Sequence, residues 1–210
     1  MPHHSAADFL VLHALKVKGF ADAVAVAELT ALPVGMVDTQ LAVACRAGQV
    51  EQREARISGW ALTTEGQARH VALLAADLDA SGPQEVLVKL YRDFTDVDAR
   101  YRQVCAEWHL RDLDGRYVAS LHDDPAYDQS VVAKLHQIDE RVQAICAALA
   151  GVEDRMAPYG HRLAAALARV DAGDRDAFSR PLARSYDEVW AELRQDLMVT
   201  MSVATTPVVA

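Results

Sequence analysis

The sequence predicts a mainly α-helical protein in two parts: a compact N-terminal unit with one small β-hairpin, and a longer antiparallel helical domain. Three observations favour this fold class. Gly- and Pro-containing turns divide the first eighty residues into short segments. After Gly48 the pattern becomes short and extended, which is typical of a hairpin. Beyond residue 84, apolar residues recur at steps of three and four, which is the spacing of a helix face.

The N-terminal unit is expected to contain six short elements. Ser5 is suited to cap the first helix, and Gly19 is suited to end it. Thr64 and Gln67 have the spacing of a capping box at the start of the last helix. The expected elements are helices at 6–18, 23–31 and 36–47, strands at 50–53 and 59–62, and a helix at 64–78. This order is that of a winged helix-turn-helix, with the hairpin as its wing.

Two long apolar stripes dominate the rest of the chain. Ser179 is expected to cap the last helix, with Pro181 in its first turn. One-sided helices of this length must bury their faces on each other or on a second copy of the chain. We therefore expect domains at 1–80 and 84–201, the second contributing to a homodimer interface. Its expected segments are helices at 86–108 and 127–149 with a loop at 111–124 between them, helices at 154–170 and 181–197, and a frayed tail at 202–210.

Composition narrows the class of protein. Hydrophobic residues make up 51% of the chain and charged residues 24%, which is a globular balance. No run of 18 apolar residues occurs, so we expect no membrane-spanning helix, and the first residues lack the pattern of a secretory signal. The three cysteines form no CxxC pair, which favours a reduced, cytoplasmic protein. Phosphate-binding glycine loops and nucleophile motifs are lacking, so neither an enzyme nor a cofactor is predicted.

Several stretches resemble bacterial regulators. One segment is similar to the helix-turn-helix of winged-helix regulators; it runs from AELTALP at 27–33 through GQVE at 48–51. SGWALTTEG at 58–66 is similar to the second wing strand and following helix of MarR-like proteins. The second domain resembles a poorly characterised bacterial family that joins a winged helix to a helical domain and is usually classed as regulatory. The stretches that carry this second resemblance are WHLR at 108–111, YGHRL at 159–163 and SYDEVWAEL at 185–193.

The resemblance implies a dimeric transcriptional regulator that binds a palindromic operator in double-stranded DNA. In such proteins the third helix enters the major groove, and the wing reaches the backbone or the minor groove. Carried over to this chain, Gln40 pairs with an adenine edge and Thr39 contacts a thymine methyl group or a phosphate. The residues implied to contact DNA are Gly35, Thr39, Gln40, Arg46, Arg53 and Arg56.

The charge of the chain leaves an alternative open. The net charge is −9, and residues 1–80 carry 6 Lys and Arg against 9 Asp and Glu. DNA binding therefore requires the few cations of this unit to gather on one face. If they are scattered or engaged by acids, the alternative is an accessory subunit whose winged helix binds a protein. The cations in question are Lys16, Lys18, Arg46, Arg53 and Arg56.

The helical domain offers a pocket for a small-molecule effector as a further hypothesis. Aromatic rings with a few polar groups suit such a pocket, although the same spacing suits ordinary helix packing. Glu192 and Asp196 lie one turn apart beside the apolar stripe and are expected to form a solvated flank. Because the sequence contains no HxxxH or HExxH pair, no metal site is predicted. The candidate pocket residues are Tyr101, Trp108, Tyr159 and Trp190.

Overall fold

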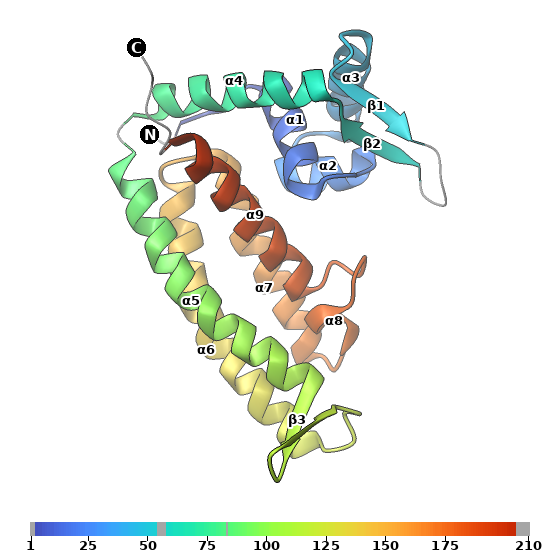
Figure 1. Ribbon diagram of the computed structural model, residues 1–210, viewed down its shortest axis with the longest axis vertical. Coiled ribbons are helices and arrows are strands. Elements are labelled where there is room, and N and C mark those ends of the chain that lie inside the picture. Colours follow the sequence, from blue (N-terminus) through green and yellow to red (C-terminus); the bar gives the residue numbers. More distant parts are fainter. Residues whose placement is uncertain (1–2, 54–57, 83, 205–210) are drawn as a thin grey trace.

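The protein is mainly helical, as predicted, with short antiparallel hairpins. A computed structural model describes residues 3–53, 58–82 and 84–204. Figure 1 shows an N-terminal unit, α1 to α4, lying across one end of a bundle of helices, α5 to α9. Helix α4 (Thr64–Ser81) runs along this end and leads toward α5, so it connects the two parts.

The N-terminal unit has the predicted order of elements. Asp22 caps α2, because its Oδ1 accepts a hydrogen bond of 2.8 Å from the backbone N–H of Ala25. The hairpin pairs β1 with β2 in an antiparallel register that sets Val50 opposite Leu62. The elements before α4 are α1 (Ala7–Lys18), α2 (Ala23–Thr30), α3 (Val34–Arg46), β1 (Val50–Arg53) and β2 (Gly59–Leu62).

Two predicted helix caps in the N-terminal unit are wrong. Ser5 does not cap α1, because its hydroxyl donates to Asp77 Oδ2 at 2.9 Å. Helix α4 is capped by Thr63 rather than Thr64, and Thr63 Oγ1 accepts from the backbone N–H of Gly66 at 3.0 Å. Ser5 therefore ties the start of the chain to α4, a long-range contact that a local pattern does not reveal.

The bundle buries both long apolar stripes within one chain. Helices α5 and α6 pack against each other, and α7 and α9 cover them. The long helices do not need a second copy to bury their apolar faces, so the homodimer stays a prediction. The elements after α4 are α5 (Glu85–His109), β3 (Leu110–Leu113), β4 (Arg116–Ala119), α6 (Pro125–Ala150), the 3₁₀ turn η1 (Asp154–Met156), α7 (Ala157–Asp171), α8 (Asp176–Ser179) and α9 (Tyr186–Ala204).

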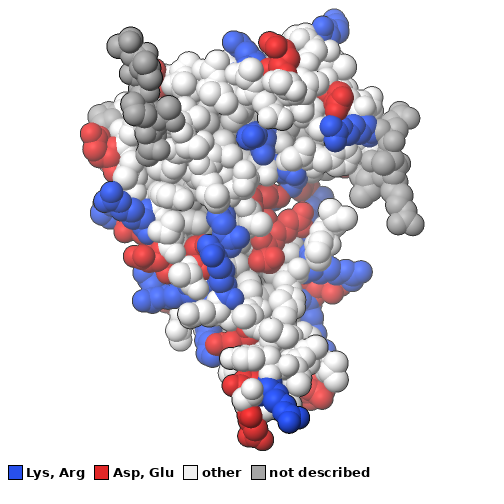
Figure 2. Space-filling model, in the orientation of Figure 1, with Lys and Arg blue, Asp and Glu red and all other residues white. Residues whose placement is uncertain are grey.

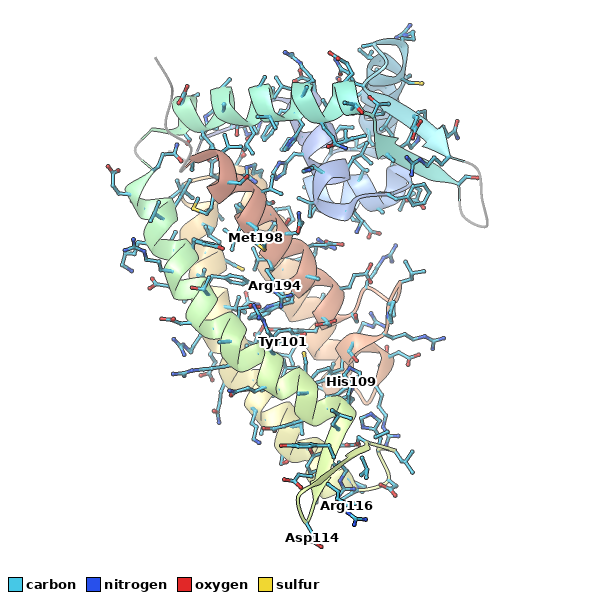
Figure 3. All side chains as sticks on the ribbon, viewed as in Figure 1. Tyr101, His109, Asp114, Arg116, Arg194 and Met198 are labelled. Atoms are coloured by element: carbon cyan, nitrogen blue, oxygen red, sulfur yellow. The ribbon has the colours of Figure 1, made fainter. Side chains whose placement is uncertain are left out.

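A second hairpin, β3–β4, replaces most of the loop predicted at 111–124. Asp114 and Gly115 form its turn with φ values of 54° and 83°. Positive φ at both central residues is the geometry that suits a two-residue hairpin, and Asp-Gly is a favoured sequence for it. Asp112 Oδ1 also accepts from the backbone N–H of Gly115 at 2.7 Å. Figure 3 labels Asp114 and Arg116 at this tip, the end of the bundle farthest from α4.

The last helix begins later than predicted. Ser179 ends the short helix α8, and α9 starts at Tyr186. Leu182 and Arg184 have φ values of 60° and 50°, and this left-handed conformation cannot continue a right-handed helix. Ser185 caps α9 instead, because its Oγ accepts a hydrogen bond of 3.3 Å from the backbone N–H of Glu188.

Two boundaries near the C-terminus also shift. The helix predicted at 154–170 consists of η1 followed by α7, with Pro158 in the first turn of α7. Helix α9 extends to Ala204, so residues 202–204, which were expected to fray, are helical. The remainder of the predicted tail lies outside the described residues.

Membrane spans were also sought among the described helices. None is by itself long and apolar enough to cross a bilayer. Helices α2 and α3 meet the length and composition criteria only when they are counted together, across a bend of 113°.

Candidate functional site

The outer face of α3 carries the residues expected to read DNA. Gly35, Thr39 and Arg46 are exposed and Gln40 is half-buried, while the opposite face packs into the core. Thr39 Oγ1 donates to the carbonyl oxygen of Gly35 at 2.8 Å, and Arg46 Nε donates to the carbonyl of Ala42 at 3.3 Å. The structure thus brings these side chains together on α3, which lies away from the bundle (Figure 1).

The same face is partly apolar and carries little net charge. Val43 lies one turn from Thr39 on this face and is 48% exposed, whereas Val34 lies on the opposite side of the helix and Met36 lines a cavity beside η1 and α7. Asp38 and Arg46, both exposed, carry opposite charges on this helix. Apolar side chains of this size gain free energy when a partner removes them from water. We call this surface the outer α3 face.

The hairpin expected to be the wing offers little free positive charge. Arg53 is exposed on β1, but its Nε and Nη2 donate to Glu51 Oε1 at 2.8 and 2.6 Å. Both nitrogens reach the same carboxylate oxygen and both side chains are exposed, so the pair contributes at most about 1 kcal/mol. A phosphate approaching Arg53 would meet the carboxylate of Glu51 beside it. Arg56, the other predicted wing residue, lies outside the described residues.

Among the remaining described cations of the N-terminal unit, Arg69 of α4 adjoins this surface, because it lines a groove together with Gln40 and Val43. Lys18 pairs with Glu192 of α9, so it faces the bundle, and Lys16 is half-buried. Figure 2 shows positive and negative residues interspersed over the N-terminal unit on the face drawn. DNA binding requires cations that gather on one face free of acids, and Lys18 and Arg53 do not meet this condition because carboxylates engage them.

A buried ionic network joins the N-terminal unit to the bundle. Its centre is Asp196 on α9, whose Oδ1 lies 2.9 Å from His13 Nε2 and 2.5 Å from Arg155 Nη1. Tyr159 donates to the other oxygen at 2.9 Å, and Arg155 Nη2 donates to Thr200 at 2.9 Å. All five side chains are buried, so helices α1, α7 and α9 and the turn η1 meet through one set of polar contacts. We call this set the Asp196 network.

The network and its surroundings shift the pKa values of Asp196 and of the neighbouring His70. Burial disfavours the carboxylate of Asp196, but Arg155 and His13 outweigh burial and hold its pKa well below the usual range. His70 of α4 lies 2.9 Å from His13. Burial, together with the charges of His13 and Lys16, lowers the pKa of His70 to about 3. Within the described residues no cluster of three His, Cys, Asp or Glu side chains is placed to hold a metal ion.

The prediction of a solvated flank at Glu192 and Asp196 is wrong. Both residues are buried, and Glu192 meets Lys18 as well as Arg162, whose Nη1 lies 2.6 Å from its Oε2. Apart from Val199, the buried apolar residues of α9 form one stripe beside these two carboxylates, so the pattern within the helix does not reveal that Glu192 and Asp196 are buried. The buried apolar residues of α9 are Tyr186, Val189, Trp190, Leu193, Leu197, Val199 and Met201.

Three of the four aromatic residues proposed for an effector pocket lie in the packed core. Tyr101 and Trp190 stack with ring centroids 4.1 Å apart, on helices α5 and α9 (Figure 3). Trp190 Nε1 donates to Asp98 at 2.8 Å, and Tyr159 belongs to the Asp196 network. Trp108, by contrast, lines a cavity beside α6. The structure therefore separates Trp108 from the other three.

Comparisons with known proteins assign no family to the chain. No family model matches it, and no curated protein or solved structure is significantly similar to it. The resemblance to MarR-like regulators therefore stays a prediction that rests on the residues that carry it. Function has to be argued from the outer α3 face, the hairpin and the Asp196 network.

Proposed function

We propose that the chain is an accessory subunit whose N-terminal unit has a winged-helix arrangement and binds a protein partner through the outer α3 face. The observation that carries this proposal is the character of that face. Val43 is nearly half exposed on this face, and the single cation of the helix, Arg46, is offset by Asp38. Apolar area with balanced charge suits a protein surface better than a polyphosphate backbone.

The Asp196 network supports the proposal in a second way. The buried contact of α1 with Asp196, together with the packing of α4 on α9, holds the N-terminal unit against the bundle, so the outer α3 face is presented in one orientation. Presenting a surface in a fixed orientation lowers the entropy that association costs. The bundle then acts as the rigid support for this surface.

A dimeric, cytoplasmic DNA-binding regulator is the second candidate. The observation in its favour is that Thr39, Gln40 and Arg46 share the outer side of α3, close to the hairpin and away from the bundle. Such a regulator would place two copies of α3 in neighbouring major grooves of a palindromic operator. Its weakness is the loss of Lys18 and Arg53 to carboxylates, because each phosphate contact depends on a free cation.

Photocrosslinking from the outer α3 face tests the proposal. A benzoylphenylalanine replaces Val43 in the full chain, and a matched control replaces Val86 on α5, which is 51% exposed against 48% for Val43. We expect one discrete protein adduct in cells from position 43 and none from position 86. Adducts of equal yield from both positions, or none from either, would contradict a partner on this face.

Fluorescence anisotropy with the DNA upstream of its own gene tests the second candidate. DNA binding through α3 predicts salt-sensitive affinity at low ionic strength, a lower affinity in Arg46→Gln and a higher affinity in Glu51→Gln, which frees Arg53. Lys89→Gln is the matched control, because Lys89 is an exposed, ion-paired cation on the bundle. Under our proposal all of these proteins bind the DNA equally weakly, and the pattern expected of α3 binding would overturn it.

A further inference from the structure

A cavity of about 510 Å³ lies between α6, the end of α7 and the Trp108 end of α5. This size is in the range of small-molecule sites. One wall is apolar and is formed by Trp108, Val132 and Val170. Trp108 is held in place by stacking on Phe178, with ring centroids 4.2 Å apart and planes inclined by 3°. The cavity therefore has a rigid aromatic wall.

A carboxylate oxygen without a hydrogen-bond donor lies beside this apolar wall. Asp128 is 9% exposed and lines the cavity near the start of α6. Its Oδ1 accepts from His122 Nδ1 at 3.0 Å, and the ring of His122 lies against Trp108. Its Oδ2 is buried without a hydrogen-bond donor among the described residues. A buried acceptor left in this state is costly, because a carboxylate usually receives two or more hydrogen bonds.

Arg175 is the nearest cation to Asp128 Oδ2, but its guanidinium does not form a hydrogen bond to this oxygen. Its Nη2 lies 3.8 Å from Asp128 Oδ2, beyond hydrogen-bond distance, and its side chain is more than half exposed. Asp171, a further carboxylate of the lining, is paired at 2.9 Å with His136. An anion in this cavity would meet two carboxylates and one exposed guanidinium, whereas a cation would find an acceptor without a hydrogen bond.

We propose that this cavity binds a small primary amine with an aromatic or aliphatic body. The ammonium group donates to Asp128 Oδ2 from the side that Arg175 now faces, and the body packs against Trp108 and Val132. Ammonium–carboxylate hydrogen bonds are stronger than neutral ones, and an aromatic face adds attraction for a nearby cation. This site is independent of the outer α3 face, which lies at the other end of the molecule (Figure 1).

Isothermal titration calorimetry of the full chain with three probes of one shape tests the charge requirement. The probes are phenethylamine, 2-phenylethanol and phenylacetate, which are cationic, neutral and anionic. We expect phenethylamine to bind with millimolar or better affinity and the other two to bind at least about tenfold more weakly. Equal binding of amine and alcohol, or no binding of phenethylamine at millimolar concentration, would overturn the proposal.

Variants of the lining locate the site. Asp128→Asn removes the charge and is expected to weaken phenethylamine at least about tenfold, whereas Asp93→Asn, an ion-paired carboxylate on α5, leaves it unchanged. Arg175→Gln removes the competing guanidinium and is expected to tighten amine binding. If Arg175 instead held a ligand through an anionic group, Arg175→Gln would weaken its binding. The direction of the change in affinity therefore distinguishes the two modes of binding.

A variant that blocks the cavity guards against a folding defect in Asp128→Asn. Ala133 is an exposed residue of the lining, so Ala133→Trp places a large ring in the opening without entering the core. We expect this variant to keep the wild-type melting temperature and to lose phenethylamine binding. Full binding in Ala133→Trp would show that the amine sits elsewhere, and would contradict the assignment of this cavity.

Discussion

The two sides of the N-terminal unit use charge in opposite ways. On the side that faces the bundle, His13 is buried against Asp196 of α9 and Lys18 is half-buried against Glu192. On the outer α3 face, by contrast, Arg46 is exposed, one turn from the half-exposed Val43. Ion pairs therefore fix the inner side of the unit against the bundle, whereas its outer α3 face remains exposed and can contact a partner.

The difference separates residues that set orientation from residues that make contacts. Removing one partner of a buried ion pair leaves an uncompensated charge and costs about 3–5 kcal/mol, whereas an exposed pair contributes about 0–1 kcal/mol. Substitutions on the side that faces the bundle should therefore lower the free energy of unfolding. Substitutions on the outer α3 face should alter the binding of a partner with little effect on stability.

Asp196→Asn should cause the largest loss. The substitution leaves the buried guanidinium of Arg155 without its closest carboxylate, and the expected cost is about 3–5 kcal/mol of unfolding free energy. Urea denaturation at neutral pH measures this cost. Asp93→Asn is the control, because it breaks an exposed pair with Lys89 and should cost less than about 1 kcal/mol. Equal losses in the two variants would contradict the division between inner and outer charges.

Gly66→Ala should rank second. Gly66 is buried in the first turn of α4, and a Cβ there would lie 1.8 Å from the carbonyl oxygen of Gln49. Because the obstacle is backbone, it cannot rotate away, and overpacking of this kind costs about 1–3 kcal/mol. The melting temperature and urea midpoint should fall together. An unchanged midpoint would mean that α4 does not pack this closely on the residue preceding β1.

Acid should weaken the inner side through His70. The folded-state pKa of His70 is about 3, below its ordinary value of 6.5. The folded protein therefore keeps His70 neutral while the unfolded chain takes up a proton. The stability that this contributes is complete above pH 6.5 and is lost as the pH falls toward 3, by about 2 kcal/mol between pH 7 and pH 5.

Urea denaturation of His70→Gln at these two pH values checks the assignment. The variant should lose this part of the pH dependence, while His109→Gln, at an exposed helix end, should keep it. Comparing each variant with the wild type removes the contribution of Glu153, whose burial raises its pKa and acts in the opposite direction. A His70→Gln protein with the wild-type slope would contradict the neutral, buried state of His70.

Local sequence pattern predicts the order of elements well in this chain. The spacing of apolar residues in α5 and α6, and the turn residues between α1 and α4, fix helices whose boundaries agree with the structure to within a few residues. The β3–β4 hairpin was missed because Asp114-Gly115 was interpreted only as part of a loop. The Asp-Gly turn between two short runs containing apolar residues was the available indication of a hairpin.

The candidate sites were less predictable because they depend on contacts between distant segments. The sequence separates His13 from Asp196 by 183 positions, and only the fold brings them together. Helix spacing alone predicts that Asp196 is exposed to solvent. Such spacing considers only neighbours within α9 and not the contacts that α1 and η1 make with this residue. The same limit applies to the cavity at Trp108, whose Asp128 is assigned by its unfilled oxygen and not by any motif.

Gly35→Ala should have the smallest effect on stability, and its sign is opposite to the others. Nothing lies within 4 Å of a Cβ at this position on the outer α3 face. Alanine restricts the unfolded chain more than glycine does, so we expect a gain of about 0.5 kcal/mol by urea denaturation. Under our proposal, the crosslink from position 43 should persist in this variant unless the partner's backbone approaches Gly35 closely. A stable Gly35→Ala protein that loses the crosslink would therefore place the partner directly over the first turn of α3, whereas a destabilised one would show that this face is packed and not open.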